Sequence, residues 1–351
     1  MSRNRVVYFV KRPDGMVTND AFAIREEPMP ILSDAESVII ESVYASVDPY
    51  MRGRMSNRKS YTAPFQVGQP MQGGMVGRIY DPGRTDLAKG AWVFGVWPWA
   101  EYAQVKAQTV RPLAPGTPPT ASLHVLGLTG LTAYIGLTQF GRSVTGEQLV
   151  VSAAAGSVGS LAGQIGKILG LRVVGIAGGP EKCAWLVDRL GFDAAVDYRH
   201  ENFPANLKNA VPDGVDVYFD NVGGTVTDCV MAELNLHARV VICGQISLYN
   251  LDSPADERPR FADLLISRAQ ATGFIVGDHQ ALYPEALEHL SVWYREGRLV
   301  AEETLVDGFD QLIDAFIGLF QGANRGKAIV KLREETGADD DSCGGASTPS
   351  A

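Results

Sequence analysis

Hydrophobic positions in the first third of the chain form short alternating runs, the pattern of β-strands that place one face on a core. Glycine, proline and aspartate lie between the runs and mark turns. We therefore predict a β-rich region from about Arg5 to Pro119, which ends in the proline-rich segment Arg111–Pro119. The predicted strands are Val6–Val10, Ser37–Val43, Gly74–Tyr80 and Ala91–Val96.

Further along the chain, helical periods alternate with short apolar strands. This alternation indicates βαβ units and a parallel sheet covered by helices. The predicted fold class is α/β, with a β-rich domain followed by a doubly wound parallel-sheet domain of the Rossmann type. The predicted helices are Leu123–Gln139, Val158–Leu169, Lys182–Leu190 and Thr225–Glu233. The predicted strands are Gln148–Ser152, Leu171–Ala177, Ala194–Asp197, Val215–Asp220 and Ala238–Cys243.

Length and charge narrow the class of protein. The 351 residues exceed the size at which one core stops growing, so we expect domains at 1–120 and 121–301. Residues 334–351 are rich in small and polar residues, and we expect a disordered tail. The net charge of −9 argues against nucleic acid or a membrane surface as partner. The Val6–Val10 run is too short for a signal peptide or a membrane span, which favours a cytoplasmic protein.

Cysteine and histidine are placed without the spacing of metal ligands. The 4 cysteines have no short paired spacing, and the predicted first domain contains none of them. His124 is the first histidine of the chain, and the others follow far downstream. A catalytic zinc needs a converging set of such side chains. We therefore expect no metal, and the chemistry must come from a bound cofactor.

Small residues after the strand at Gln148–Ser152 form a turn with A-x-x-G-x-x-G spacing. Ala153 and Gly156 permit a tight turn and a close approach of the backbone to a pyrophosphate, and Gly159 permits close packing of helix on strand. Ser157 and Val158 open the helix, whose free N–H groups favour an anion. Small residues can also merely pack a helix on a sheet, but the βαβ context favours dinucleotide binding.

The end of the next strand indicates which dinucleotide is bound. A site for NAD usually carries an acidic residue there for the ribose 2′-hydroxyl. Here the strand ends without one, Gly178 leaves room, and Lys182 follows in the first turn of the next helix. Glu181 is explained by its place at a helix N-terminus. A solvated surface lysine is the alternative for Lys182, but the missing acid favours NADPH.

Several longer motifs follow one another in a fixed order up to Leu332. They resemble the zinc-independent medium-chain dehydrogenase/reductases, in particular the branch of leukotriene hydroxydehydrogenases/prostaglandin reductases, curcumin reductase and plant alkenal double-bond reductases. The block at Ser46–Met55 and the Tyr-Asn pair in Cys243–Asn250 are more specific than any glycine motif. The other blocks are Ala153–Gly159, Gly178–Cys183, Leu190–Asp193, Phe219–Gly224, Gly273–Val276 and Gly322–Lys327.

The resemblance implies a GroES-like first domain that is completed by residues 302–333, with the active site between the domains and a homodimer as the assembly. It also implies that Lys182 and Tyr198 hold the 2′-phosphate. The remaining cofactor contacts that it implies are Asn221, Cys243, Tyr249, Asn324 and the backbone of Phe274, Ile275 and Val276.

The reaction that the resemblance implies is reduction of the carbon–carbon double bond of an apolar enone or enal. Hydride transfer to the β-carbon leaves an enolate, whose oxygen needs a hydrogen-bond donor in place beforehand. A tyrosine hydroxyl suits this role because its ordinary pKa is about 10, so that it stays neutral at pH 7 and can donate its proton in a hydrogen bond. Tyr249 is the first candidate and Tyr50 the second. The alternative for either is a tyrosine that fills an interdomain wall.

Other features leave more than one interpretation open. Arg52 and Arg54 can clamp a carboxylate, although arginines in such a turn more often bind backbone carbonyls or form an ion pair. The aromatic run from Trp92 to Tyr102 can shape an apolar pocket for a bulky substrate, but it alternates like a strand, which favours one face in the core and only part of the run near the cleft. Thr129 replaces a proline common in relatives, and the loop after Asn250 also departs from them. A quinone reductase and a non-catalytic NADPH-binding scaffold are the rival functions.

Overall fold

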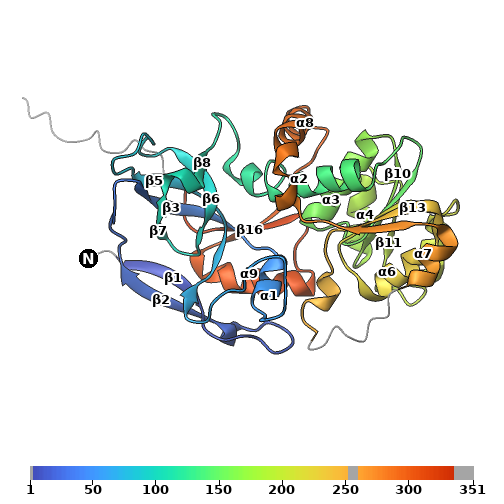
Figure 1. Ribbon diagram of the computed structural model, residues 1–351, viewed down its shortest axis with the longest axis horizontal. Coiled ribbons are helices and arrows are strands. Elements are labelled where there is room, and N and C mark those ends of the chain that lie inside the picture. Colours follow the sequence, from blue (N-terminus) through green and yellow to red (C-terminus); the bar gives the residue numbers. More distant parts are fainter. Residues whose placement is uncertain (1–2, 252–259, 336–351) are drawn as a thin grey trace, which may run out of the picture.

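The computed structural model describes residues 3–251 and 260–335, which fold into two lobes (Figure 1). The predicted α/β fold class is confirmed. Most of the predicted tail, from residue 336, lies outside the described residues. The strands are β1 (Arg3–Phe9), β2 (Phe22–Pro28), β3 (Ser37–Ser46), β4 (Gln69–Pro70), β5 (Gln72–Asp81), β6 (Trp92–Pro98), β7 (Tyr102–Lys106), β8 (Val110–Pro112), β9 (Gln148–Val151), β10 (Arg172–Ala177), β11 (Ala194–Asp197), β12 (Val215–Asp220), β13 (Leu234–Ile242), β14 (Gln270–Gly273), β15 (Glu303–Asp307) and β16 (Lys327–Lys331). The α-helices are α1 (Tyr50–Arg54), α2 (Leu128–Ile135), α3 (Ser157–Ile168), α4 (Pro180–Asp188), α5 (Phe203–Ala210), α6 (Gly224–Met231), α7 (Phe261–Ser267), α8 (Tyr283–Arg295) and α9 (Leu312–Gly318).

The first lobe is built on a 7-stranded sheet with the order β15-β16-β3-β5-β6-β8, in which β7 also pairs with β3. A smaller sheet, β2-β1-β4, packs beside it. The aromatic run on β6 contributes to the core, because Trp97 and Trp99 are fully buried and Trp97 Nε1 donates to Ser42 Oγ at 3.0 Å. Strands β15 and β16 come from the end of the chain, so the second lobe is inserted between strands of the first lobe.

The second lobe contains a 6-stranded sheet with the order β11-β10-β9-β12-β13-β14, and all of its strand pairs are parallel. Alternation along β9 separates two cores. Leu149 and Val151 face a core that includes α3 and α8, whereas Val150 faces a core that includes α5 and α6. Both faces are therefore covered by helices, which explains why these strands are apolar on both sides.

The helix predicted at Leu123–Gln139 is divided into shorter segments. A 3-10 turn covers Pro119–Leu123, α2 begins at Leu128, and a wider helical turn covers Gly136–Phe140. The chain folds back tightly before α2, where a Cβ atom on Gly127 would lie 2.1 Å from the carbonyl oxygen of Ser122. This close backbone approach needs glycine and interrupts the helix, which the hydrophobic period alone does not show.

The order of the parallel strands reverses between β9 and β12, and this position is where ligands bind in open α/β sheets. A hydrogen-bond network joins the carboxyl ends of the two strands. Ser152 Oγ donates to Asp220 Oδ1 at 3.0 Å and accepts the backbone N–H of Asn221 at 2.9 Å. The side-chain amide of Asn221 donates to the Ser152 carbonyl at 2.8 Å. The network fixes Asn221 beside the turn that follows β9.

Within residues 3–251 and 260–335, no helix combines the length and the apolar character that a membrane crossing requires.

Candidate cofactor and substrate site

The turn after β9 has the geometry of a phosphate site. Ala153 adopts a left-handed conformation with φ of 47°, in the position where the usual motif has glycine. A Cβ atom on Gly159 would lie 2.4 Å from the Ala153 carbonyl oxygen, so this position needs glycine. Gly156 caps α3 in an extended conformation without a side-chain cap, and Val158 follows in the first turn. The first N–H groups of α3 thus remain available to an anion.

Ser157 supports the same conclusion. Its hydroxyl is buried and has no hydrogen-bond partner among the described residues. A buried hydroxyl without a partner is costly, and it generally marks a missing ligand or water. A phosphate oxygen at the N-terminus of α3 would satisfy it. The turn therefore fits the pyrophosphate of a dinucleotide.

Gly178, Lys182 and Tyr198 come together at the ends of β10 and β11, as a 2′-phosphate site requires. A Cβ atom on Gly178 would lie 2.9 Å from Tyr198 Cε1 and 2.9 Å from Arg199 Nε. Lys182 Nζ donates to the carbonyl oxygens of Gly322 and Asn324, each at 2.7 Å. Burial, and then the positive charge of Arg199, lower the pKa of Lys182.

Arg199 is a candidate that sequence reasoning missed. It adds a cation beside Lys182, and Arg325 also lowers the pKa of that lysine. Arg325 pairs with Glu302, whereas no carboxylate within salt-bridge distance of Lys182 or Arg199 is found in the described part of the chain. Asp197 accepts the N–H groups of Gly179 and Arg199 through Oδ1, at 2.8 and 2.9 Å. This cluster of cations fits a dianionic phosphate.

Of the remaining residues expected at the cofactor, Cys243 and Phe274 directly follow β13 and β14, and Asn324 precedes β16 of the first lobe. The backbone N–H of Cys243 donates to the Asp220 carbonyl at 2.8 Å, and burial raises the pKa of the Cys243 thiol to about 12. The Phe274 ring is buried and stacks on Phe140, with the ring centroids 4.8 Å apart. In the residues that follow, the Ile275 carbonyl accepts the N–H of Asp278 at 3.0 Å, and the Val276 carbonyl accepts the hydroxyl of Tyr283 at 3.2 Å. Asn324 donates its side-chain amide to the Gly326 carbonyl at 2.8 Å.

Three tyrosines share one electrostatic environment. Tyr249 accepts the backbone N–H of Gln245 at 3.4 Å through its hydroxyl, and burial raises its pKa to about 12. Burial, followed by the charge of Asp48, raises the pKa of Tyr50. Tyr61 lies close enough to raise the pKa of both Tyr50 and Tyr249. Sequence reasoning missed Tyr61, which lies in a polar loop without any periodic pattern.

The arginines of α1 bind backbone carbonyls, as the structural interpretation predicted. Arg52 is buried, and its Nη2 donates to the Gly15 carbonyl at 2.7 Å. Arg54 Nε donates to the Ala63 carbonyl at 3.0 Å. Thr129 is also buried, and its hydroxyl donates to the His124 carbonyl at 2.9 Å, so that this hydroxyl is committed to the fold.

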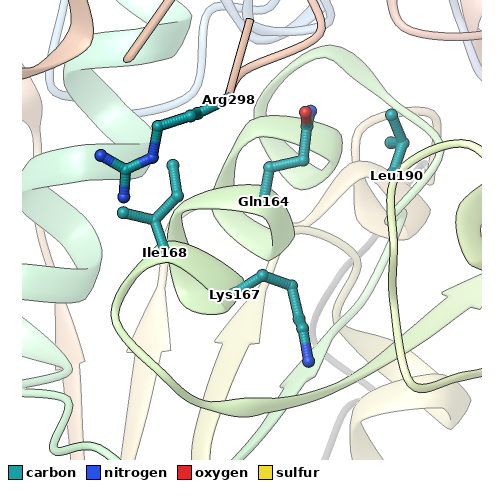
Figure 2. Close-up of a pocket in the computed structure, with 5 residues that line it drawn as sticks. All are labelled: Gln164, Lys167, Ile168, Leu190 and Arg298. Carbon is teal, nitrogen blue, oxygen red and sulfur yellow. The ribbon is translucent and has the colours of Figure 1, made fainter. Parts of the chain in front are cut away.

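Other potential sites are weaker. Among the residues that the structure describes, no group of three or more histidine, cysteine, aspartate or glutamate side chains is placed to hold a metal ion. Figure 2 shows a hollow at the C-terminal end of α3, away from the phosphate turn, which is lined by Gln164, Lys167, Ile168, Leu190 and Arg298. The charged heads of Lys167 and Arg298 point apart, and Lys167 is paired with Asp193 at 2.7 Å. This hollow has no converging charge for a ligand.

The fold and the site define a two-domain dehydrogenase/reductase. It has a β-rich lobe, a parallel-sheet lobe, and a phosphate turn at the point where the order of the parallel strands reverses. Family models match both parts: "N-terminal domain of oxidoreductase" covers residues 5–113, and "Zinc-binding dehydrogenase" covers residues 157–291. The chain belongs to the medium-chain dehydrogenase/reductases, in the zinc-independent branch of curcumin, alkenal and prostaglandin reductases, as the sequence motifs predicted. It is an oxidoreductase of that family.

Individual relatives cover nearly the whole chain. The NADPH-dependent curcumin reductase of Escherichia coli (strain K12) is 38% identical over 94% of this chain and 97% of its own. The NADP-dependent 2-alkenal reductase of Nicotiana tabacum is 35% identical over 95% and 96%, respectively. The crystal structure of CurA from Vibrio vulnificus in complex with NADPH superposes with a TM-score of 0.90, at 39% identity, and covers 94% of this chain and 99% of that one.

Proposed function

We propose that this protein uses NADPH to reduce the carbon–carbon double bond of apolar α,β-unsaturated ketones or aldehydes. The observation that carries the proposal is the convergence of two sites. A phosphate turn with an adjacent cationic cluster, Lys182 and Arg199, lies in the parallel-sheet lobe. Tyr50 and Tyr249 lie where that lobe meets the first one, and burial raises the pKa of both hydroxyls. The curcumin and alkenal reductases among the relatives support the same reaction class.

The first task of the chain is to hold and orient the cofactor. The first turn of α3, from Gly156 to Gly159, binds the pyrophosphate through backbone N–H groups. Lys182, Tyr198 and Arg199 bind the 2′-phosphate, and Asn221 and the backbone of 274–276 lie toward the nicotinamide half. When bound, NADPH supplies a hydride to the β-carbon of the substrate double bond.

The second task is to stabilise the charge that develops on the substrate carbonyl oxygen. Tyr249 donates its hydroxyl proton in a hydrogen bond to this oxygen. A phenol with an ordinary pKa of about 10 is already neutral at pH 7, and burial raises the pKa of Tyr249 further. Its oxygen meanwhile accepts from Gln245, which leaves the proton for the substrate. Tyr50 is the second donor. The α-carbon of the enolate then takes its proton from solvent.

The experiment that tests the proposed function follows NADPH oxidation with a medium-chain enone, with a quinone and without acceptor. We expect turnover with the enone. Turnover with the quinone alone would establish the quinone reductase instead. NADPH binding without turnover of either acceptor would establish the scaffold.

We also propose that the chain forms a homodimer through β14 and α7. Strand β14 is the edge of the parallel sheet, and all of its residues are exposed, which leaves backbone groups ready to pair with a second copy. On the adjoining α7, Phe261, Leu265 and Ile266 are 69, 77 and 74% exposed. Light scattering should give a dimer for wild type and a monomer for Leu265→Glu, with Leu305→Glu on β15 as the exposed control. A monomeric wild type would contradict the proposal.

A further inference from the structure

A single buried arginine joins the two most specific sequence blocks across the lobes. Arg52 lies in α1 of the first lobe and is 5% exposed. Its Nε donates to Asn250 Oδ1 at 2.9 Å, and its Nη2 donates to the Gly15 carbonyl at 2.7 Å. Asn250 belongs to the other lobe and directly follows Tyr249. The planar guanidinium thus bonds two partners in fixed directions.

The segment that carries Tyr249 is held firmly on the side that precedes the tyrosine. The N–H groups of Ile246 and Ser247 donate to the carbonyls of Asn221 and Val222 at 3.2 and 3.1 Å. The bond of Tyr249 itself to the Ile246 carbonyl is long, at 3.4 Å. After the tyrosine, the N–H of Leu251 donates to the Leu248 carbonyl at 3.2 Å within the segment, and arginine side chains of the first lobe bind Asn250 and Leu251. The segment that carries Tyr249 is therefore held from both lobes.

The contacts from the first lobe differ in burial. Arg58 donates to the Leu251 carbonyl at 2.9 Å, but this bond is exposed. The bond from Arg52 to Asn250 is partly buried and involves a charged donor, so its loss costs more. The same short helix, α1, begins with Tyr50. One helix thus presents one candidate donor and holds the segment that presents the other.

We propose that Arg52 and Asn250 are positioning residues, which form an interdomain latch that holds Tyr249 in place for enone reduction. The catalytic part of this proposal rests on the proposed function, whereas the positioning of the Tyr249 segment by the bond between Arg52 and Asn250 can be tested separately. Opening the latch should leave the cofactor phosphate site intact, because Lys182 is held by the carbonyls of Gly322 and Asn324, and the turn of α3 is held by the bond from Gly326 to Ala155. Its loss should therefore lower kcat more than it weakens NADPH binding.

The experiment compares Asn250→Ala and Asn250→Asp with wild type. Asn250→Ala removes the acceptor and should raise hydrogen–deuterium exchange in residues 245–251 and lower kcat about tenfold or more, with the NADPH Kd within twofold. Asn250→Asp retains an acceptor oxygen and should restore kcat. Arg54→Lys, which changes an arginine of α1 with a contact inside the first lobe, is the matched control.

A double variant tests whether the latch acts through Tyr249. If it does, Asn250→Ala should have little further effect on kcat in the Tyr249→Phe background. Additive losses, or unchanged exchange in residues 245–251 of Asn250→Ala, would overturn the latch. If wild type reduces no enone, the proposed function fails, and the exchange measurement alone then supports or overturns the latch.

Discussion

At the residue scale, the proposed reaction depends on a tyrosine hydroxyl that stays protonated and on two cations, Lys182 and Arg199. Among residues 3–251 and 260–335, neither cation has a carboxylate within salt-bridge distance. Tyr249 keeps its proton because burial disfavours the phenolate. Lys182 remains paired with carbonyl oxygens, which orient the ammonium group without neutralising it. Each of these features leads to a distinct kinetic prediction.

Removal of the Tyr249 hydroxyl should slow the chemical step. Tyr249→Phe retains the ring but loses the donor to the developing oxyanion, so kcat should fall about 10- to 100-fold while the NADPH Kd changes little. Steady-state kinetics with an enone and fluorescence titration with NADPH measure both quantities. An unchanged kcat would leave the enzyme in place and remove Tyr249 from the donor role.

The pH profile tests the protonation state of the same group. A phenol loses its proton above its pKa, and the pKa of Tyr249 is raised to about 12, so the donor persists through the ordinary pH range. We expect kcat to show no basic limb from pH 7 to roughly pH 10, the ordinary pKa of tyrosine. A limb below pH 10 that disappears in Tyr249→Phe would contradict this assignment.

The cationic cluster should determine the choice between NADPH and NADH. Lys182→Ala and Arg199→Ala each remove a charge-assisted bond to the 2′-phosphate and should raise the KM for NADPH roughly 10- to 100-fold. NADH lacks that phosphate, so its KM should change little. Lys208→Ala on α5 changes an exposed lysine outside the site and serves as the control. Equal losses with both cofactors would contradict the specificity role.

At the element scale, close packing of α3 on the sheet fixes the phosphate turn. A Cβ atom on Gly163 would lie 1.8 Å from Phe192 Cζ, so Gly163→Ala should destabilise the fold by about 1–3 kcal/mol despite the better helix propensity of alanine. Gly53 in α1 has no atom within 4 Å of such a Cβ, and Gly53→Ala should be neutral or slightly stabilising. Urea unfolding compares the two. An unchanged free energy of unfolding in Gly163→Ala would show that the Phe192 ring can move to accommodate the extra methyl group.

Elements with a strong period were predictable, whereas those set by tertiary contacts were not. The strands from β9 to β12 agree closely with their predicted ranges, because short apolar runs mark them in the sequence; β11 is the weakest of these, being largely half-buried and ending at Asp197. Strand β13 begins earlier than predicted, at Leu234, since its first residues are half-buried or exposed and lack that signal. The short helix α1 has no period to detect, and Arg52 revealed its interdomain partner only in the folded chain.

The candidate site shows the same division. Lys182 was predictable because the first turn after β10 has a fixed relation to the cofactor in this fold. Arg199 and Tyr61 come from loops whose paths no local pattern determines, and they became candidates only through their neighbours. The residue roles, the domain limits at 120 and 301 and the effect of the loop after Asn250 stay predictions. That loop lies outside the described residues from position 252.

At the scale of the whole molecule, the return of β15 and β16 to the first lobe connects that lobe directly to the phosphate turn. The backbone N–H of Gly326, just before β16, donates to the Ala155 carbonyl in the phosphate turn at 2.8 Å. Lys182 in turn binds the loop at 322–324. Cofactor binding in one lobe is therefore linked by direct contacts to the lobe that carries Tyr50.

The most direct test of the central claim is the fate of the transferred hydrogen. NADPH that carries deuterium at C4 of the nicotinamide is incubated with the enzyme and an enone, and the product is analysed by NMR and mass spectrometry. Hydride transfer from NADPH to the β-carbon of the enone predicts a saturated ketone with deuterium on the β-carbon. An allylic alcohol with deuterium on the carbinol carbon, or no saturated ketone at all, would contradict it.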